Sequence, residues 1–407
     1  MPTTLIVGAS VGGIRTAQAL RSSGYDGEIL IADADSTPPY DKPPLSKSLL
    51  AGDQRMDEIR LLSASETAES DFELLLGHRA MTLHAAQRTV TMTHGRTVTY
   101  DDLVVATGAA ARPSVWGAPA GVHLLRSASD AVALRYALQE DGPVVIVGAG
   151  FIGTEVAATA VSIGHTDVTL IDPADMPLTR ILPANVARSV FDLHRDRGVK
   201  TRFGTGVTRI MPHPPGVQVH LTDGSVRRAR TVVLGIGAVP NDEWLAPSDV
   251  AVNDGVLCDE FGHSASAPHV WAVGDVARWR RPDTTTSVRA EHWTNAVEQA
   301  GIVAHNLTHP DDLRAHDPVD YVWTNQYDWK IQVVGQAGAA KRCLRVARQG
   351  NNRSFAEIAI DQNGTTCGGV AINWPRALTT CRRVLREPVA TRQPAQELAD
   401  TLASTSR

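Results

Sequence analysis

Two stretches of the chain share one alternation of apolar and polar positions, and each predicts a strand, a helix and a second strand. In each stretch, a short run of β-branched residues leads into a glycine-rich turn. Apolar residues then recur at every third or fourth position, which is typical of an amphipathic helix. A glycine ends the helix, and a second apolar strand ends in aspartate. The stretches begin at Thr4 and Pro143, so the chain is predicted to contain two βαβ units.

Apolar runs bounded by proline and glycine predict the remaining elements. A helical pattern extends from Trp293 to Leu307, and beyond Pro318 the pattern changes to a series of strands followed by a helical tail. We expect the residues from about Arg392 onward to be loose. The predicted strands outside the two repeats are 103–106, 217–221, 232–234, 270–273, 321–327, 330–334, 344–347, 354–360 and 366–372.

The second glycine-rich turn predicts a bound dinucleotide. Gly148, Gly150 and Gly153 form a complete G-x-G-x-x-G between a strand and a helix. Such glycines permit a tight turn, the approach of a pyrophosphate and close helix–strand packing. Asp172 follows Gly153 by 19 residues, where a carboxylate bonds a ribose 2′-hydroxyl and repels a 2′-phosphate. This favours NADH over NADPH; the alternatives are a glycine-rich turn without a ligand and a solvated strand-end carboxylate.

The first turn departs from this pattern. It contains Gly8, Ser10 and Gly13, with serine where the second glycine is expected. The Cβ of Ser10 must be accommodated where the backbone approaches a phosphate. Because a complete copy follows later in the chain, we still predict a second dinucleotide. The simplest pair is a permanently held flavin and a nicotinamide that exchanges.

Composition narrows the class of protein. The chain has 407 residues, enough for two to three domains at about 150 residues each. Its 39 basic and 44 acidic residues give a net charge of −5. The sequence contains no basic segment interleaved with aromatic residues, so nucleic-acid binding is not indicated. We find neither a basic leader nor an apolar run of roughly 18 residues, so we expect no membrane insertion and a cytoplasmic location.

Cysteine usage excludes one type of chemistry. The four cysteines include no C-x-x-C pair, so neither a metal site nor a disulfide scaffold is indicated. Flavoproteins that pass electrons through a thiol need a reactive cysteine near the flavin. None precedes Cys258 here, which argues against a thiol relay.

Four segments, in this order, carry a resemblance to a known family. They are PYDKPPLSK (39–47), LVVATGA (103–109), GIGAVPN (235–241) and VWAVGDVA (270–277). With Gln326, Tyr327, Val334 and Gly335, they resemble the FAD-dependent NADH:ferredoxin reductases of the putidaredoxin reductase and biphenyl dioxygenase ferredoxin reductase type. The resemblance extends over nearly the whole chain.

The resemblance implies an α/β fold of the glutathione-reductase-like, two-dinucleotide flavoprotein kind. Two Rossmann-like domains would bind FAD and NAD, and a small α+β domain would follow. We expect a discontinuous FAD-binding domain over residues 1–112 and 240–318, an NAD-binding domain over 113–239 and a C-terminal domain over 319–407.

The resemblance also implies the residues of the site. The expected catalytic residues are Lys47, beside the flavin, and Glu155, at the nicotinamide. Either Asp33 or Asp35 meets the FAD ribose, because the glycine that usually precedes this acid is absent. The other expected cofactor contacts are Ala80, Thr107, Gly108, Arg126, Gly237, Gly274, Asp275 on the ribityl chain, Trp293 on the isoalloxazine and Trp323 where electrons leave. The alternative for both tryptophans is core packing.

Lys47 also stands out for a reason that does not depend on the resemblance. Only five of the 39 basic residues are lysines. A compact ammonium with rotatable donors suits the N5/O4 edge of a flavin better than a planar guanidinium. The alternative is an ordinary surface lysine.

The function implied by the resemblance is transfer of electrons from NADH through FAD to an acidic iron–sulfur ferredoxin of the [2Fe–2S] kind. That ferredoxin would serve a cytochrome P450 or a ring-hydroxylating oxygenase. The alternatives are a rubredoxin-, nitrite- or oxygen-directed reductase on the same scaffold, and a regulatory flavoprotein like apoptosis-inducing factor. Basic segments that could contact a ferredoxin, or be merely solvated, are 278–281, 341–348 and 382–386, together with Arg314.

Overall fold

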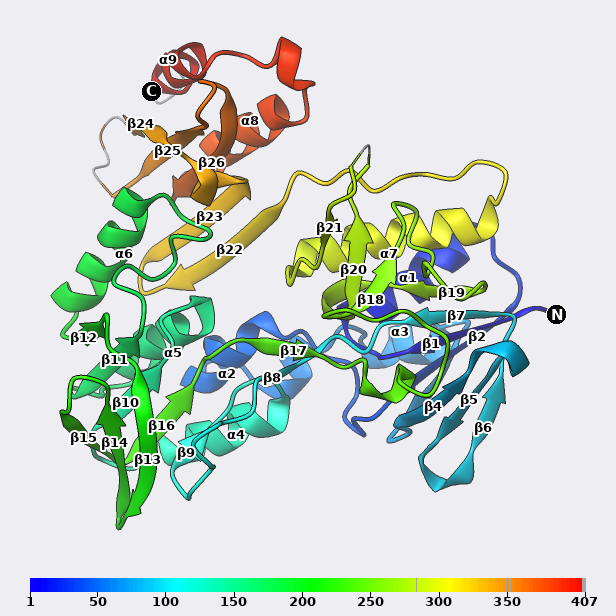
Figure 1. Cartoon of the computed structure of the whole chain (residues 1–407), viewed down its shortest axis with the longest axis horizontal. Coiled ribbons are helices and arrows are strands. Elements are labelled where there is room, and N and C mark those ends of the chain that lie inside the picture. Colours follow the sequence, from blue (N-terminus) through cyan, green and yellow to red (C-terminus); the bar gives the residue numbers. More distant parts are fainter. Residues whose placement is uncertain (283, 349, 351–352, 405–407) are drawn as a thin grey trace. The chain divides into compact units, whose positions relative to one another are not determined.

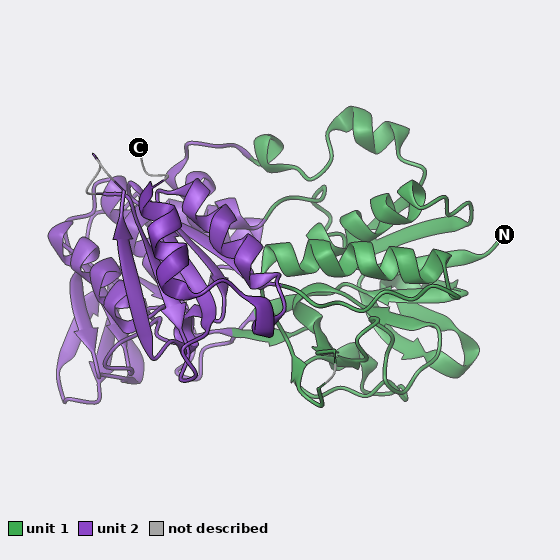
Figure 2. Ribbon diagram, turned by 90° about the horizontal axis from the view of Figure 1, so that it is seen from above, with its two compact units in different colours: residues 1–41, 56–110, 238–318 green, residues 42–55, 111–237, 319–407 purple. Residues whose placement is uncertain are grey.

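The structure, a computed structural model, describes residues 1–282, 284–348, 350 and 353–404. The chain divides into two compact units, which Figure 2 colours separately. Unit 1 comprises residues 1–41, 56–110 and 238–318, and unit 2 comprises residues 42–55, 111–237 and 319–407. Each unit contains one of the two predicted βαβ repeats.

Unit 1 is built on a five-stranded parallel sheet in the order β19-β7-β1-β2-β3. Figure 1 labels β19, β7, β1 and β2 of this sheet. Helix α1 (Val11–Ser22) connects β1 to β2 and packs against α7 (Trp293–Thr308). The strands of this sheet are β1 (Thr3–Val7), β2 (Glu28–Asp33), β3 (Glu73–Leu76), β7 (Asp102–Val105) and β19 (Val270–Ala272). Unit 1 also contains α3 (Ala64–Glu69), the antiparallel strands β4 (Ala80–His84), β5 (Thr89–Met92) and β6 (Thr97–Thr99), and the strands β18 (Val256–Cys258), β20 (Ala277–Arg280) and β21 (Ser287–Val288).

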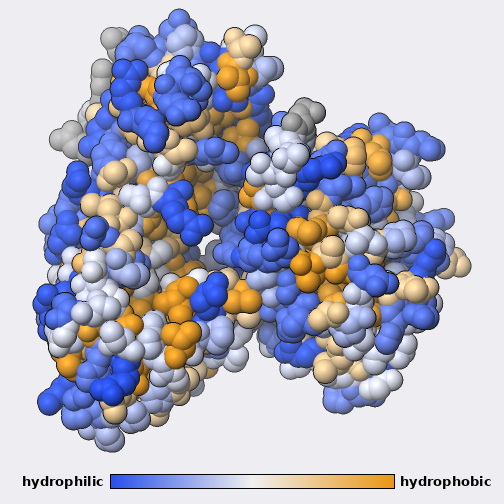
Figure 3. Space-filling model, in the orientation of Figure 1, coloured by the Kyte–Doolittle hydropathy of each residue, from blue (hydrophilic) through white to orange (hydrophobic). Residues whose placement is uncertain are grey.

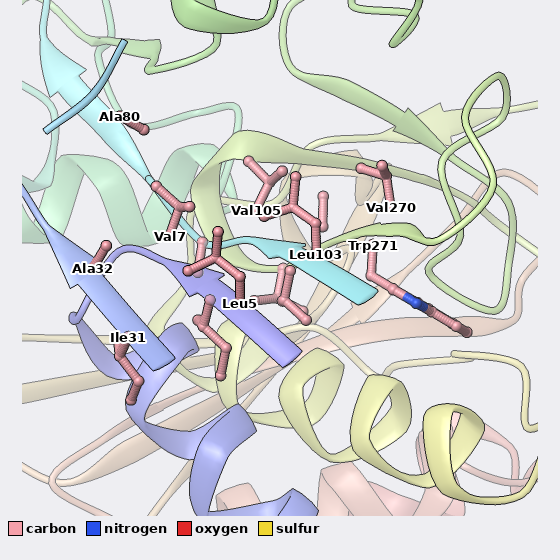
Figure 4. Packing of buried hydrophobic residues seen from close by; sticks show 14 of the residues in the cluster. Leu5, Val7, Ile31, Ala32, Ala80, Leu103, Val105, Val270 and Trp271 are labelled. Carbon is pink, nitrogen blue, oxygen red and sulfur yellow. The ribbon is translucent and has the colours of Figure 1, made fainter. Parts of the chain in front are cut away.

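The core of unit 1 explains why its strands are continuous apolar runs. Parallel strands covered on both faces have no solvent side, so alternation is lost. Leu5 and Ile31 are completely buried, as are Leu103 and Val270. Figure 4 shows side chains from these four strands packed together. This sheet therefore provides a rigid edge from which the loops of a site can extend.

Unit 2 contains a second parallel sheet, in the order β12-β11-β10-β16-β9. Helix α5 (Phe151–Ser162) connects β10 to β11, as α1 connects the equivalent strands of unit 1. The sheet strands are β9 (Val122–His123), β10 (Val144–Val147), β11 (Val168–Asp172), β12 (Lys200–Phe203) and β16 (Thr231–Leu234). Also present are α2 (Ser48–Ala51), α4 (Ala128–Ala137), α6 (Ala184–Asp196) and the antiparallel strands β13 (Val207–His213), β14 (Gly216–Leu221) and β15 (Val226–Ala229). The short strands β8 (Ala109–Ala111) and β17 (Ala238–Pro240) lie where the chain passes between units.

The last part of unit 2 is a five-stranded antiparallel sheet in the order β22-β23-β26-β25-β24. Its strand β22 packs against α5. The strands are β22 (Tyr321–Gln326), β23 (Trp329–Gly335), β24 (Arg342–Ala347), β25 (Phe355–Ile360) and β26 (Thr366–Ile372), followed by α8 (Pro375–Leu385) and α9 (Ala395–Ser404). The predicted fold class, two dinucleotide-type sheets with a small α+β part, is confirmed.

The prediction that the chain is loose from about Arg392 was wrong for the residues up to 404; residues 405–407, on which it also falls, lie outside the described residues. Residues 395–404 form α9, in which Leu398 and Leu402 are completely buried. Both leucines join an apolar cluster with side chains of α8 and the neighbouring sheet. A spacing of four residues places both on one helix face, and this burial outweighs the tendency of a terminus to fray.

Among the described residues, no helix has the length and apolar character needed to cross a membrane. On the face drawn in Figure 3, hydrophilic residues predominate and apolar residues occur in small groups.

Candidate functional site

The first glycine-rich turn, in unit 1, requires two of its glycines for steric reasons. Gly8 has φ of +114°, and a Cβ there would lie 2.2 Å from the Ala106 carbonyl oxygen. A Cβ on Gly13 would lie 1.9 Å from the Gly8 carbonyl oxygen. Ser10, the residue that departs from the motif, has extended backbone at the N-cap of α1, and its side chain makes no capping bond. The turn therefore keeps its shape with serine there, and the first N–H groups of α1 can meet a pyrophosphate.

Of the two candidate acids in unit 1, Asp33 is the one that contacts this turn. Its Oδ2 accepts the Ala9 N–H at 2.5 Å, and its Oδ1 accepts the Asp35 N–H at 2.8 Å. Asp35 instead bonds within its own loop, to the Thr37 N–H at 2.9 Å and the Tyr40 hydroxyl at 3.3 Å. The end of β2 thus presents Asp33 beside the glycines.

Hydrogen bonds between distant segments hold other predicted residues of unit 1. The Thr107 hydroxyl donates to the Asn241 carbonyl oxygen at 2.7 Å, and the Asn241 amide donates back to the Thr107 carbonyl oxygen at 2.8 Å. The Trp293 indole N–H donates to Asp41 Oδ1 at 2.8 Å. These loops are therefore anchored at the edge of the parallel sheet.

The remaining predicted residues of unit 1 lie on the same set of loops and strands. Gly274, just before Asp275, donates its N–H to Gln299 Oε1 at 2.8 Å. Gly108 has a left-handed φ of +65°. Ala80 begins β4 and is buried within the core (Figure 4).

The second turn, in unit 2, repeats the geometry of the first. A Cβ on Gly148 would lie 2.2 Å from the Gly235 carbonyl oxygen, and one on Gly153 would lie 1.8 Å from the Gly148 carbonyl oxygen. A Cβ on Gly150, in contrast, would meet no protein atom within 4 Å. The fold therefore demands the outer glycines but not the middle one. An absent side chain facing open space fits a ligand that approaches the backbone.

Asp172 occupies the same place in unit 2 as Asp33 in unit 1. Its Oδ2 accepts the Ala149 N–H and its Oδ1 accepts the Ala174 N–H, both at 2.8 Å. An ionised carboxylate offers about four acceptor positions. Two hydroxyl donors of a ribose can therefore still be accommodated.

Glu155, on α5, is a carboxylate with almost no access to water. It is 3% exposed. Its Oε2 lies 2.7 Å from Lys47 Nζ and accepts the Ser46 hydroxyl at 2.5 Å, while its Oε1 accepts the Thr324 hydroxyl at 2.6 Å. A buried charge needs such partners to offset its loss of hydration. The structure thus joins Lys47 and Glu155, the two predicted catalytic residues, into one ion pair.

Arg126, Gly237 and Trp323 make other contacts. Arg126 donates its backbone N–H to Asp130 Oδ2 at 3.0 Å, just before α4. Gly237 accepts the Arg112 N–H at 2.9 Å. Trp323, next to Thr324 on β22, is half-buried and stacks on Tyr321 with ring centroids 5.7 Å apart.

Two residues of the Glu155 cluster were missed in the sequence. Ser46 belongs to the segment PPLSK, so its position beside Lys47 was a usable signal. Thr324 carries no such signal, because a threonine in a strand is ordinary. Only the packing of β22 on α5 brings it to Glu155.

Two further observations concern the thiols and the metal-binding side chains. Burial raises the pKa of Cys258, Cys343, Cys367 and Cys381, which is the opposite of what a reactive thiolate requires. Over the described part of the chain, no group of three or more His, Cys, Asp or Glu side chains is arranged to hold a metal ion.

His194, on α6, is a buried neutral imidazole. It is completely buried, and burial lowers its pKa from 6.5 to about 4. Between these pH values the unfolded state binds a proton that the folded state does not, so acidification destabilises the protein. We predict that His194 contributes about 3 kcal/mol to the loss of unfolding free energy between pH 7 and pH 4. Urea unfolding of the wild type and of His194→Gln will measure this; an equally steep fall in the variant would contradict it.

Two protein families match the chain. "Pyridine nucleotide-disulphide oxidoreductase" matches residues 2–300, and "Reductase C-terminal" matches residues 321–406. One relative is the anthranilate 1,2-dioxygenase system ferredoxin–NAD(+) reductase component of Burkholderia cepacia, 33% identical over 97% of this chain and 96% of its own length. Putidaredoxin reductase CamA of Pseudomonas putida is 32% identical over 84% of this chain and 82% of its own length.

Solved structures agree with these matches. The chain is similar to one in the covalent putidaredoxin reductase–putidaredoxin complex, with a TM-score of 0.88, 28% identity and 99% coverage of both chains. The ferredoxin reductase for the CYP199A2 system from Rhodopseudomonas palustris gives a TM-score of 0.91 at 28% identity, with 99% of this chain and 98% of that chain covered.

Proposed function

This chain belongs to the pyridine nucleotide-disulphide oxidoreductase family, and from that premise we propose that it is a ferredoxin–NAD(+) reductase that passes electrons from NADH through FAD to an iron–sulfur ferredoxin. This acceptor is proposed because the names of two relatives include one: a ferredoxin for the dioxygenase system reductase, and putidaredoxin for putidaredoxin reductase. We further propose that the protein works in the cytoplasm and that its ferredoxin serves a cytochrome P450 or a ring-hydroxylating oxygenase.

The observation that carries this proposal is the Glu155–Lys47 pair next to a dinucleotide-type turn. Glu155 lies two residues after Gly153, at the start of α5. When bound, NAD in its reduced form supplies hydride donation, and FAD supplies hydride acceptance and one-electron release. The protein's task is then to bind, orient and exclude water, which an ion pair bonded to the hydroxyls of Ser46 and Thr324 can do.

We propose a role for each set of residues. In unit 1, Gly8, Ser10, Gly13 and Asp33 hold the pyrophosphate and ribose of FAD, with Asp33 rather than Asp35 as the ribose acid. The other unit 1 residues proposed to contact FAD are Ala80, Thr107, Gly108, Gly274, Asp275 and Trp293. In unit 2, Gly148, Gly150, Gly153 and Asp172 hold NADH, Glu155 faces its nicotinamide and Lys47 lies beside the flavin; Arg126, Gly237 and Trp323 remain proposed cofactor contacts.

We also propose the domains expected from the sequence, with FAD bound by residues 1–112 and 240–318 and NAD by residues 113–239; the compact units group residues 42–55 and 319–407 with the NAD-binding part. Residues 319–407 would form the C-terminal domain. The support is that each parallel sheet carries its own glycine turn and acid.

The direct test is purification followed by an acceptor panel. The protein should be yellow, release FAD on denaturation and reduce a [2Fe–2S] ferredoxin rapidly with NADH. Colourless protein after gentle purification would contradict the FAD assignment. Reduction of FAD without passage of electrons to any ferredoxin would contradict the acceptor and favour a regulatory flavoprotein.

Asp172 is predicted to select NADH. In Asp172→Asn the side chain keeps one acceptor oxygen but loses the charge that repels a 2′-phosphate. We expect kcat/KM for NADPH to rise relative to NADH on the order of tenfold, about 1.4 kcal/mol. The matched control is Asp167→Asn, at a carboxylate of the same unit that pairs with Lys200 at 2.8 Å. A ratio unchanged in Asp172→Asn would show that Asp172 does not contact the ribose.

The structure separates the basic segments that could contact an acidic ferredoxin. Arg278 pairs with Asp254, and Arg280 pairs with Glu260, so these two charges are neutralised. Arg383 and Arg386, on and just after α8, are exposed and form no ion pair with any residue that the structure describes. An uncompensated positive charge attracts an acidic partner over a longer range.

We therefore predict that Arg383→Ala with Arg386→Ala raises the KM for ferredoxin several-fold at low salt. The arginines in ion pairs supply the control, since Arg278→Ala with Arg280→Ala should raise the KM for ferredoxin less. Ferricyanide reduction, which needs no docked protein, should be unaffected in both. Equal losses with ferredoxin and ferricyanide would exclude α8 as the docking surface.

A further inference from the structure

A line of hydrogen-bonded side chains crosses the interior of unit 2 and ends on Glu155. The Tyr327 hydroxyl lies 2.9 Å from His194 Nδ1, and His194 Nε2 lies 2.9 Å from Gln326 Oε1. Gln326 Nε2 is 3.3 Å from Thr324 Oγ1, whose hydroxyl bonds Glu155 at 2.6 Å. His194, Gln326 and Thr324 are completely buried. Three elements, α6, β22 and α5, therefore share one continuous polar line.

The direction of every bond in this line follows from its last member. An ionised carboxylate only accepts hydrogen bonds, so the Thr324 hydroxyl must be the donor to Glu155. Thr324 Oγ1 can then only accept, which turns the Gln326 NH2 group toward it. The same NH2 group lies 2.8 Å from Thr154 Oγ1, whose own hydroxyl donates to the Gly150 carbonyl oxygen. Both threonines thus require the same orientation of the Gln326 amide.

The remaining two bonds are then determined as well. The Gln326 carbonyl oxygen faces His194 and accepts a hydrogen bond from the Nε2–H. Nδ1 of a neutral imidazole is left as an acceptor, and the Tyr327 hydroxyl donates to it. Burial lowers the pKa of His194 to about 4, so the ring is neutral at pH 7 as this arrangement requires. All donors in the line point toward the carboxylate of Glu155.

At the far end of the line, Tyr327 has a backbone conformation that is unfavourable for a residue with a side chain. Tyr327 and Asp328 form the two-residue turn between β22 and β23, and Tyr327 has a left-handed φ of +54°. Glycine or asparagine adopts this conformation at lower cost. The tyrosine side chain compensates through its bond to His194 and through the Arg197 guanidinium, 4.9 Å from the ring centroid. Such strain persists where the surrounding contacts over-determine the position.

We propose that Gln326 and His194 are positioning residues for the oxidation of NADH: they orient the Thr324 hydroxyl onto Glu155 and so hold its carboxylate directed at Lys47. This inference rests on the function proposed above, in which Glu155 faces the nicotinamide. The line polarises Glu155 and does not relay protons, because a glutamine amide has no proton to pass on without changing its bonding.

The kinetic test compares isosteric variants of the yellow holoenzyme. Thr324→Val removes the donor to Glu155 and keeps the shape, while Thr324→Ser restores a hydroxyl. Thr366→Val is the matched control, because Thr366 is equally buried in the same sheet and its hydroxyl has no hydrogen-bond partner among the described residues. Stopped-flow reduction of the flavin by NADH separates the limiting rate from the apparent Kd.

We expect Thr324→Val and Gln326→Leu to lower the limiting rate on the order of tenfold. The apparent Kd for NADH should change less than about twofold, because the glycine turn and Asp172 are untouched. Thr324→Ser should recover most of the rate, and Thr366→Val should match the wild type. If Gln326→Leu does not fold, Thr324→Val still decides, since it preserves the volume of the side chain.

A spectroscopic measurement tests the hydrogen-bond directions along the line without relying on enzyme turnover. Nitrogen NMR of histidine-labelled holoenzyme should show one imidazole that keeps its proton on Nε2 between pH 5 and pH 8, and His194→Gln should remove that signal. In Gln326→Glu, a carboxylate faces the same ring and should raise the pKa of His194 into the titrating range. If the signal that His194→Gln removes belongs to an imidazole with its proton on Nδ1, the direction of the line and the proposal with it are overturned.

The variant Glu155→Gln separates the positioning role of Gln326 and His194 from the role proposed for Glu155. If it slows flavin reduction and Thr324→Val does not, the positioning role is overturned while Glu155 keeps its proposed function. If Glu155→Gln itself reduces at the wild-type rate, the nicotinamide role of Glu155 is wrong, and the inference falls with it. Slow reduction in Glu155→Gln, Thr324→Val and Gln326→Leu, at a normal Kd for NADH, supports both.

Discussion

Replacing Lys47 with methionine is expected to lower the free energy of unfolding by about 3 kcal/mol, because Glu155 would remain as a buried carboxylate without its cation. The side chains of Lys47 and Glu155 are only 18% and 4% exposed, so water cannot replace the lost partner. The hydroxyls of Ser46 and Thr324 still bond Glu155. The expected loss is therefore at the lower end of the roughly 3–5 kcal/mol that breaking a buried ion pair costs. Urea unfolding with FAD in excess measures the change.

The double variant Lys47→Met with Glu155→Leu is expected to regain most of this stability. Replacing both charges by apolar groups of similar size removes the desolvation cost together with the attraction. The same variant should not oxidise NADH at the wild-type rate, so stability and activity separate. The exposed pair Lys200–Asp167 is the control: Lys200→Met should cost less than about 1 kcal/mol. A Lys47→Met variant as stable as this control would show that the pair does not stabilise the fold.

The second large effect is expected at the glycine turn of unit 2. In Gly153→Ala, the new Cβ would lie 1.8 Å from the Gly148 carbonyl oxygen, so α5 must move away from β10. We expect a loss of more than about 4 kcal/mol, enough to prevent accumulation of folded protein. The measurement is soluble yield and the unfolding midpoint of whatever protein is recovered.

Gly150→Ser is the matched variant within the same turn. Its Cβ would meet no protein atom within 4 Å, and Ser10 occupies the equivalent position in unit 1. We expect normal folding and an increase in the Kd for NADH on the order of tenfold, because the side chain would enter the space of the pyrophosphate. Two equally unfolded variants would contradict the idea that Gly150 serves the ligand, and two equally stable variants would contradict the close packing at Gly153.

Local features of the chain were predictable because they depend on neighbouring residues. A glycine with φ of +114° at Gly8, an acid at the end of β2 and an apolar helix face are each properties of a short segment. The same holds for α7, which begins at Trp293 as its pattern indicates. The prediction of a loose tail failed because the burial of Leu398 depends on α8 and the sheet beside it.

Features that join distant segments were not predictable. Arg278 and Arg280 looked like a basic surface, but Asp254 and Glu260 neutralise them. The sequence did not show that Asp33 rather than Asp35 bonds the glycine-rich turn. Nothing in the sequence connects Thr324 or His194 with Glu155.

The sequence by itself therefore determined the two βαβ repeats, their glycines and acids, and the family to which the chain belongs. Short-range steric rules shape a strand–turn–helix segment in the same way wherever it occurs, and such segments are visible in the order of residues. Only the tertiary structure decided that Lys47, Glu155 and the line from Tyr327 form one buried polar cluster. A charge removed from water is stable only beside specific partners, and packing rather than sequence distance decides which partners are near.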